Sequence, residues 1–357
     1  MGSEADGIGP VVEDDAATFQ LPDVEPTLSG VRLLPALSLP DGQLEFGWSG
    51  GCWRLRLPRP PVWRMEYRLQ LRHRDGGLEE ICDPGNARTA PGAFGDKSVL
   101  EFPDYRAPWW LDTEPVPGGH TDLLVPARAL GRDIAVRIWA PHAVAADEPL
   151  PMLVAHDGPE YDRLAGLTRY AGALIGSGAL PPHRVSLLAP GERNEEYSAN
   201  PAYAHALAIH VLPALRDAVG VRGHMVGMGA SLGALAMLHA QRHYPGRLRG
   251  LFLQSGSFFD RRLDPQERRF SRFARVTRFV ADVRRRKTNS EPVPTVITCG
   301  AAEENLANNR QMTTILQQLG YPARFVEAPD AHNYVGWRDA FDPALTELLR
   351  SLWSRPS

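Results

Sequence analysis

The sequence has little cysteine, little net charge and no long apolar run. Its 357 residues include only three cysteines, at widely separated positions 52, 82 and 299, which argues against a disulfide framework or a four-cysteine zinc site. The formal net charge is −3, from 39 basic and 42 acidic residues, whereas a general nucleic-acid binder carries a basic excess. No stretch approaches the roughly 20 apolar residues of a membrane-spanning helix. We therefore expect no nucleic-acid partner, no membrane partner and no metal.

The N-terminus lacks the basic start and apolar core of a signal peptide, so the expected location is cytoplasmic. Residues 1–25 contain seven acidic side chains and no lysine or arginine, with interspersed glycine and proline and no helical periodicity. Such a composition predicts an acidic flexible tail over residues 1–25.

Residues 26–112 are predicted to form a small all-β sandwich domain. The run from Trp63 to His73 alternates apolar and polar side chains, as a half-buried antiparallel strand does. Asp75-Gly76-Gly77 follows and is typical of a hairpin turn. Residues 113–120 are rich in proline and glycine and are predicted to be a linker.

Residues 121–357 alternate strand-like and helix-like segments, which predicts an α/β domain with a mainly parallel sheet and helices on both faces. Within it, Gly229-Ala-Ser231-Leu-Gly233 lies between an apolar strand pattern and an Ala/Leu-rich helix pattern. A GxSxG sequence in this context predicts a sharp strand-to-helix turn that exposes the serine hydroxyl at a helix N-terminus. Ser231 is therefore the candidate nucleophile, and the alternative is a glycine-rich turn without chemistry.

A serine nucleophile needs a base and an acid, which follow the last strands in the α/β-hydrolase order. His332 lies in a loop after the last predicted strand, in the place expected for the base. The preceding strand ends at Gly300, so Glu303 or Glu304 is the expected acid, and Asp330 is a further alternative. Each carboxylate could instead be a solvated loop charge.

The oxyanion formed during acyl transfer needs two N–H donors. The first is expected from Leu232, next to the nucleophile. The second should come from the loop after the strand that ends near Asp157. Pro159 has no N–H, so Gly158 or Glu160 is the expected donor.

Several segments together resemble the enterochelin esterase-like branch of the Putative esterase (esterase D) family, in the α/β-hydrolase superfamily. They are HDGPEYD at 156–162, RNEEY at 193–197, GASLG at 229–233, CGAAEEN at 299–305 and HNYVGWR at 332–338. The resemblance implies an N-terminal domain that helps to form the substrate cleft, and a serine hydrolase that needs no cofactor. It implies Ser231 as nucleophile and His332 as base, and a G-x-x-E pattern selects Glu303 as acid. It suggests substrate-binding roles for Arg193, Glu196, Tyr161 and Trp337.

Two positions depart from the family pattern. Asp330-Ala-His-Asn333 replaces the usual Gly-Gly-His-Asp, which should leave a triad intact, and Pro159 replaces a residue credited with an oxyanion N–H. The implied activity is hydrolysis of a carboxylic ester, such as a siderophore trilactone, through an acyl-enzyme. Alternatives are an acyltransferase, a macrocyclising enzyme, a carbohydrate esterase or a catalytically silent binding protein with this fold. A sugar platform would leave Trp109 and Trp110 facing solvent.

A strongly basic segment, residues 261–287, contains eleven arginines and lysines and three acidic residues. Interleaved Phe and Val residues have helical spacing, so a basic amphipathic helix is predicted. One interpretation is a cap that attracts an anionic small-molecule ester. The other is a solvated helix face, neutralised in part by the acidic tail.

Overall fold

The computed structural model describes residues 9–25, 27–92, 95–145, 147–285 and 291–353. Within this part, the chain forms two compact units. The first unit contains the residues up to Arg106 together with two later segments, 300–303 and 328–336. The second unit contains the rest of the chain, from Ala107 onward.

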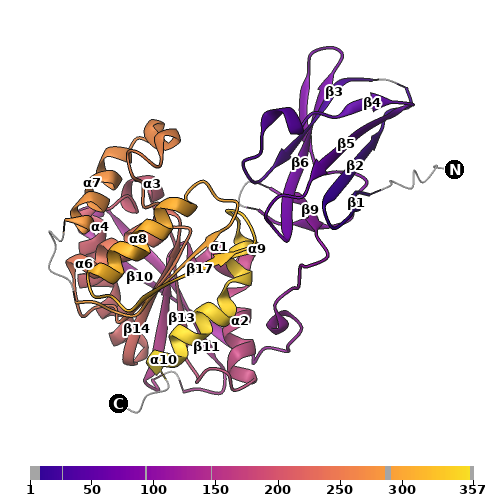
Figure 1. Cartoon of the computed structure of the whole chain (residues 1–357). Helices are drawn as coiled ribbons and strands as arrows, with labels where there is room; N and C mark the ends of the chain where they lie inside the picture. Colours follow the sequence, from indigo (N-terminus) through magenta and orange to yellow (C-terminus); the bar gives the residue numbers. More distant parts are fainter. Residues whose placement is uncertain (1–8, 26, 93–94, 146, 286–290, 354–357) are drawn as a thin grey trace. The chain divides into compact units, whose positions relative to one another are not determined.

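The first unit is built on two antiparallel sheets that share one apolar core (Figure 1). One sheet has the order β1 (Val11–Val12), β2 (Ala16–Pro22), β5 (Cys52–Pro58) and β4 (Gly47–Ser49). The other has the order β3 (Leu28–Pro35), β6 (Arg64–His73), β9 (Lys97–Glu101) and β8 (Thr89–Ala90), with β7 (Leu78–Ile81) paired to β6. The predicted sandwich is confirmed. The alternation of side chains along β6 agrees with its burial, because the apolar Met65, Tyr67 and Leu69 lie in the core and are at most 1% exposed.

The predicted tail over residues 1–25 is wrong for the segment that the structure describes. Strand β2 pairs along its whole length with β5, and Phe19 in β2 is 1% exposed in the sandwich core. Residues 16–22 have apolar side chains at alternating positions, a signal that the acidic composition of the flanks obscured. Residues 1–8 lie outside the described residues.

The second unit contains an eight-stranded sheet. The pairings from β13 through β12, β14 and β15 to β16 are all parallel, whereas β11 pairs antiparallel with both β10 and β13. The order is β10 (Gly118–Ala127), β11 (Arg132–Pro141), β13 (Arg184–Leu188), β12 (Leu150–Ala155), β14 (Val221–Ala230), β15 (Gly250–Gln254), β16 (Thr295–Gly300) and β17 (Ala323–Ala328). Strands β12 and β15 are buried throughout, as expected for strands covered on both faces. This is the predicted α/β-hydrolase architecture.

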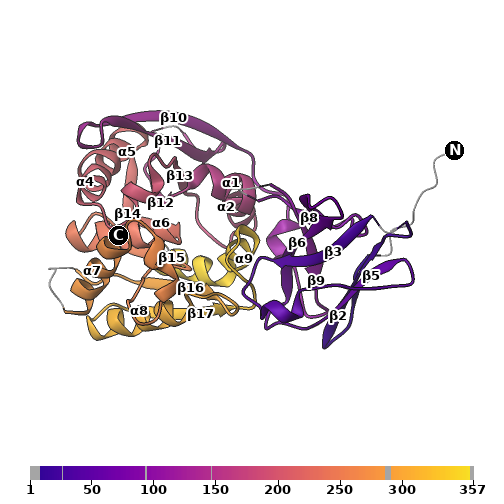
Figure 2. The ribbon, with the colours of Figure 1, turned by 90° about the horizontal axis from the view of Figure 1, so that it is seen from above.

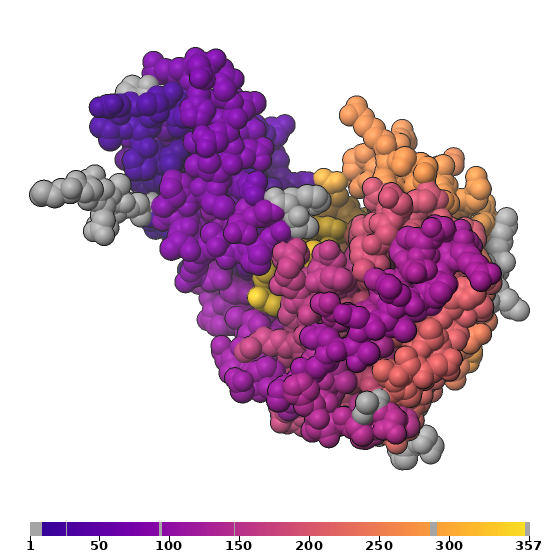
Figure 3. All heavy atoms as spheres, turned by 180° about the vertical axis from the view of Figure 1, so that it is seen from behind, coloured from indigo at the N-terminus to yellow at the C-terminus, as the bar shows by residue number. Residues whose placement is uncertain are grey.

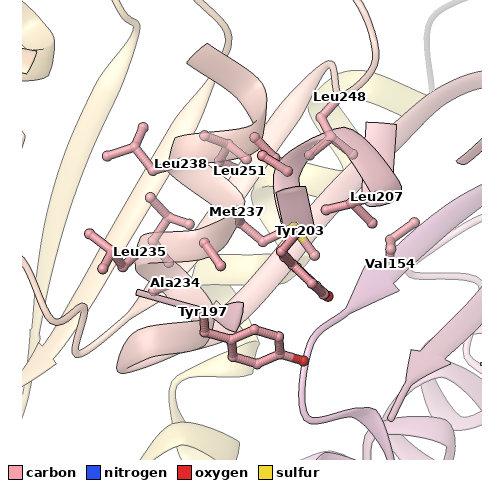
Figure 4. Close-up of a cluster of buried hydrophobic side chains, with 14 of the residues drawn as sticks. Val154, Tyr197, Tyr203, Leu207, Ala234, Leu235, Met237, Leu238, Leu248 and Leu251 are labelled. Atoms are coloured by element: carbon pink, nitrogen blue, oxygen red, sulfur yellow. The ribbon is translucent and has the colours of Figure 1, made fainter. Parts of the chain in front are cut away.

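Helices lie on both faces of this sheet (Figures 1 and 2). They are α1 (Gly158–Ala165), α2 (Leu167–Gly176), α3 (Arg193–Glu196), α4 (Pro201–His205), α5 (Leu212–Val219), α6 (Leu232–His243), α7 (Phe273–Arg284), α8 (Leu306–Gln318), α9 (Tyr334–Asp339) and α10 (Thr346–Trp353). Helix α6 is almost wholly buried, and Leu235, Met237 and Leu238 pack in the main core (Figure 4). That packing fixes the N-terminus of α6, where Ser231 lies.

The predicted linker over residues 113–120 differs from the structure at both ends. Before it, Trp110 falls within the predicted sandwich domain but is fully buried in the second unit, where it lies edge-on to Tyr170 and is stacked on Phe341. At its end, strand β10 begins at Gly118 and forms an edge of the sheet (Figure 3). Its mixed exposure leaves no clean alternation in the sequence, which is why the strand was not predicted. In the described residues, no helix is long and apolar enough to cross a membrane.

Candidate active site

Ser231 occupies a strained turn between β14 and α6. Its backbone has φ 54° and ψ −122°, a conformation that non-glycine residues adopt rarely and that costs on the order of 1–3 kcal/mol. Its N–H donates to the carbonyl of Gln254 (2.9 Å), and its carbonyl accepts from Leu235 N–H (3.2 Å). The predicted sharp strand-to-helix turn is therefore present.

The two glycines of the GxSxG segment are required by close packing across this turn. A Cβ at Gly229 would lie 2.6 Å from the backbone carbonyl of Gly233. A Cβ at Gly233 would lie 3.2 Å from His156 Cβ and 3.3 Å from Asp157 Oδ2. Both glycines thus allow the turn to fold back and to approach the loop after β12.

That loop is tied to the serine turn by His156, which is fully buried. Its ring Nδ1 lies 2.9 Å from the carbonyl oxygen of Gly233, and its backbone N–H donates to the carbonyl of Met228 (3.0 Å). Burial lowers the pKa of His156 to about 4, so the ring is neutral at neutral pH. The loop that follows it, with Gly158, therefore lies beside the turn that carries Ser231.

The candidate oxyanion donors lie at the start of two helices. Leu232 is the first residue of α6. Helix α1 begins at Gly158, has Pro159 and Glu160 in its first turn, and its N–H to carbonyl ladder begins with Tyr161 N–H donating to Asp157 (2.9 Å). First-turn N–H groups have no partner within a helix, so Pro159 occupies a position where the helix needs no donor. The N–H groups of Gly158 and Glu160 stay candidates for the second donor.

Glu303 and His332 form a close pair in the first unit. Nδ1 of His332 lies 2.7 Å from Oε2 of Glu303, and Gly300 N–H donates to Oε1 of the same carboxylate (2.7 Å). The Glu303 side chain is 1% exposed, whereas that of His332 is 41% exposed. A Cβ at Gly300 would lie 2.8 Å from Glu303 Oε1, so the glycine makes room for the carboxylate.

The other two candidate acids have different surroundings. Glu304 is exposed. Asp330 is buried, and its Oδ1 accepts from the N–H of Ala331 (2.7 Å) and the amide of Asn333 (2.9 Å). The side-chain Oδ1 of Asn333 accepts from Gly336 N–H (2.8 Å). Asp330 and Asn333 thus shape the loop on which His332 lies, and the structure favours Glu303 as its carboxylate partner.

Arg193 and Glu196 are each held by an internal ion pair. Arg193 donates two bonds of 2.8 Å to the carboxylate of Asp157, directly before Gly158. Glu196 is buried and accepts two bonds from Arg132, at 2.7 and 2.5 Å. The bond to Glu196 raises the pKa of Arg132. These contacts indicate that Arg193 shapes the loop after β12, and that the Glu196 carboxylate is already paired.

The suggested substrate-binding roles of Tyr161 and Trp337 do not agree with their burial. Tyr161 is fully buried and its hydroxyl donates to Gln254 Oε1 (2.9 Å). Trp337 is 8% exposed and its indole N–H donates to Ser255 Oγ (2.9 Å). Both side chains are buried and bonded to residues at the end of β15 or directly after it, so we infer a structural role for them.

The basic segment forms α7 and a preceding projection (Figures 1 and 3). Val276, Phe279, Val280 and Val283 bury the apolar face of α7, as predicted. Arg275 binds Glu195 (2.6 Å), as does Arg272, so a residue of α3 supplies part of the neutralising charge. Arg261, Arg262, Arg268, Arg269 and Arg278 are exposed and have no acidic partner in the described chain. Residues 286 and 287 lie outside the described residues.

A comparison with protein-family models matches residues 127–348 to the family described as Putative esterase. The chain belongs to this family. It is a carboxylic ester hydrolase, in agreement with the resemblance found in its sequence.

A search of curated proteins gave no match. No group of three or more potential ligands suited to a metal ion occurs in the described residues.

Some solved structures are similar to this esterase over nearly its whole length, and others over about two thirds of it. Ferric enterobactin esterase from Salmonella typhimurium has a TM-score of 0.80 at 19% identity, covering 98% of each chain. Enterobactin esterase from Shigella flexneri, solved in the presence of 2,3-dihydroxy-N-benzoyl-glycine, has a TM-score of 0.75 at 19% identity, covering 99% of each chain. A ferulic acid esterase matches 65% of this chain and 98% of its own, with a TM-score of 0.52 at 18% identity. At these identities the likeness establishes the fold.

One side chain that touches the serine turn was not predicted from the sequence, since Ser257 Oγ lies 3.1 Å from Ser231 Oγ. Ser257 could have been found from its position, because it follows the strand β15, which neighbours the nucleophile strand, and parallel strands end at the same edge of a sheet.

Proposed function

We propose that this esterase acts through a Ser231–His332–Glu303 triad and an acyl-enzyme. The observation that carries the proposal is the backbone of Ser231, whose positive φ is maintained at the N-terminus of a buried helix. Strain of this kind persists where the surrounding structure enforces it and is common at catalytic residues. The carboxylate–imidazole bond between Glu303 and His332 supports the assignment of the other two members.

In this mechanism Glu303 accepts the bond from His332 Nδ1–H, which leaves Nε2 free to accept the Ser231 proton. Ser231 Oγ attacks the ester carbonyl, and N–H groups of Leu232 and of the 158–160 segment stabilise the oxyanion. His332 then gives its proton to the leaving alcohol. Water attacks the acyl-enzyme by the same steps, and Ser231 is released.

We infer that the substrate is an anionic ester of the siderophore trilactone class. Structures of the Shigella flexneri esterase were solved in the presence of enterobactin and of 2,3-dihydroxy-N-benzoyl-serine, and they match 97% and 99% of this chain. The five exposed arginines without an acidic partner give this chain a local positive charge, which would attract an anion. The segment that carries them is linked through Arg275 and Glu195 to α3, which carries the Arg193 that binds Asp157.

The test is hydrolysis of short-chain p-nitrophenyl esters by wild type, Ser231→Ala and Ser186→Ala, followed by intact-mass detection of the acyl-enzyme. Ser186 is a buried serine of β13 and serves as the matched control. We expect Ser231→Ala to lose turnover and adduct, and Ser186→Ala to retain both. Equal rates in wild type and Ser231→Ala would refute the triad. Hydrolysis of a ferric trilactone well above that of a neutral lactone would support the substrate class.

A further inference from the structure

A second hydroxyl lies against the nucleophile. Ser257 Oγ is 3.1 Å from Ser231 Oγ, and Ser257 N–H donates to the Ser231 carbonyl (3.1 Å). Ser257 is 3% exposed. We propose that Ser257 is a catalytic residue, whose hydroxyl donates a hydrogen bond to Ser231 Oγ when negative charge develops on that oxygen. The inference rests on the proposed role of Ser231 as nucleophile.

The path of the backbone after β15 brings Ser257 to this position. The strand ends at Gln254, whose carbonyl accepts from Ser231 N–H. Ser255 has a positive φ of 47°, which turns the chain sharply, and its N–H donates to Thr298 (2.7 Å) in the next strand. The turn therefore places Ser257 against Ser231 at the cost of a second strained non-glycine residue.

Two asparagine side chains hold the turn at Ser255 and Gly256. Asn309 accepts from Gly256 N–H (2.8 Å) and donates to Gly256 carbonyl (2.9 Å). Asn305 donates to the carbonyl of Ser255 (2.8 Å), and Trp337 donates to its hydroxyl (2.9 Å). Asn309 is fully buried. Because the two residues before Ser257 are held in this way, little reorganisation is needed to keep Ser257 against Ser231, which is the condition for effective electrostatic stabilisation.

The proton balance gives Ser257 a defined part in both half-reactions. In the resting pair either hydroxyl can be the donor. Once His332 takes the Ser231 proton, Ser231 Oγ can only accept, so Ser257 keeps its own proton and donates. During deacylation the same oxygen leaves as an alkoxide, and Ser257 donates to it again until His332 returns a proton. The N–H groups of the oxyanion hole act on the carbonyl oxygen, whereas Ser257 acts on the nucleophile oxygen.

Ser257→Ala tests the inference, with Ser186→Ala as the control for loss of a buried hydroxyl elsewhere in the unit. The measurements are kcat and KM for a p-nitrophenyl ester, and the rate constant for labelling of Ser231 by a fluorophosphonate. A hydrogen bond to a charged group is typically worth about 10- to 100-fold. We expect kcat and the labelling rate to fall by that factor in Ser257→Ala, with KM changed by less than about threefold, and Ser186→Ala to match wild type.

The outcomes separate this inference from the proposed function. If Ser231→Ala abolishes turnover while Ser257→Ala keeps kcat and the labelling rate within about twofold of wild type, the role of Ser257 is refuted and the nucleophile stands. An increase in KM without loss of kcat in Ser257→Ala would also refute it, because that pattern reports substrate binding. If Ser231→Ala retains full turnover, the proposed triad is refuted, and the role of Ser257, which rests on it, is refuted as well.

Discussion

Replacing Glu303 with glutamine should preserve the shape of the acid–base pair and reverse the tautomer of His332. Oε1 of Glu303 accepts from Gly300 N–H, and Oε2 accepts from His332 Nδ1. In Glu303→Gln the amide oxygen must remain on Gly300, because two N–H groups cannot face each other. The amide NH2 then faces Nδ1, which becomes an acceptor, and the ring proton moves to Nε2.

A His332 protonated at Nε2 cannot take the proton of Ser231. In the serine-protease triad, the equivalent loss of the correct tautomer lowers kcat by about 10⁴, which corresponds to about 5 kcal/mol of transition-state stabilisation. We expect a loss of about 10³- to 10⁴-fold here, because the Gly300 bond enforces the same orientation. Folding should be little affected, because glutamine has nearly the same shape as glutamate. The substitution also removes a charge from a side chain that is 1% exposed, and a buried charge is costly.

The assay is steady-state ester hydrolysis by Glu303→Gln and Glu304→Gln, with thermal unfolding of each variant. Glu304 is the exposed neighbour, so Glu304→Gln should keep kcat within about twofold. If Glu303→Gln kept more than about a tenth of the wild-type kcat while remaining folded, the tautomer argument would be wrong. A large loss in Glu304→Gln alone would assign the acid to that residue instead.

Two further predictions concern stability and the support of the His332 loop. Burial lowers the pKa of His156 and of His183 from 6.5 to about 4, so the unfolded chain binds more protons than the folded one between those values. The free energy of unfolding should fall as pH drops from about 6.5 to 4, by up to about 3 kcal/mol per histidine. When that free energy is measured by urea unfolding and plotted against pH, the slope should be shallower for His183→Asn than for wild type. An unchanged slope would contradict the assignment. Val335, 5% exposed, packs on Ala90 and Val99 of the sandwich strands, and Trp63 N–H donates to the Pro329 carbonyl (2.8 Å). Val335→Asp should therefore displace the loop that carries His332 and lower kcat by more than about tenfold, with Val335→Ile as control; wild-type kcat in a folded Val335→Asp protein would show that this contact does not support the site.

The sequence predicted the parts of the site that depend on local backbone geometry. Helix α6, Leu232–His243, begins directly after Ser231, as a GxSxG segment between a strand pattern and a helix pattern predicts. The place of Ser231 follows from the same pattern. Glu303 and Glu304 could not be separated by spacing alone, since both follow the same strand. The turn after Gly300 decides between them, because it directs one carboxylate inward to His332 and leaves the other exposed.

Tertiary structure decided the contacts that depend on which strands are neighbours. The acidic composition of residues 1–25 predicted a tail, yet β2 gains a partner in β5, more than thirty residues later, and buries Phe19. The family resemblance suggested that Tyr161 and Trp337 bind substrate, but both side chains are buried. Ser257 is 26 residues from Ser231, and only the adjacency of β14 and β15 joins them. Composition and residue spacing indicate the local backbone preference of a segment. Which side chains are buried, and which lie close together, depends on the pairing of strands that are far apart in the sequence.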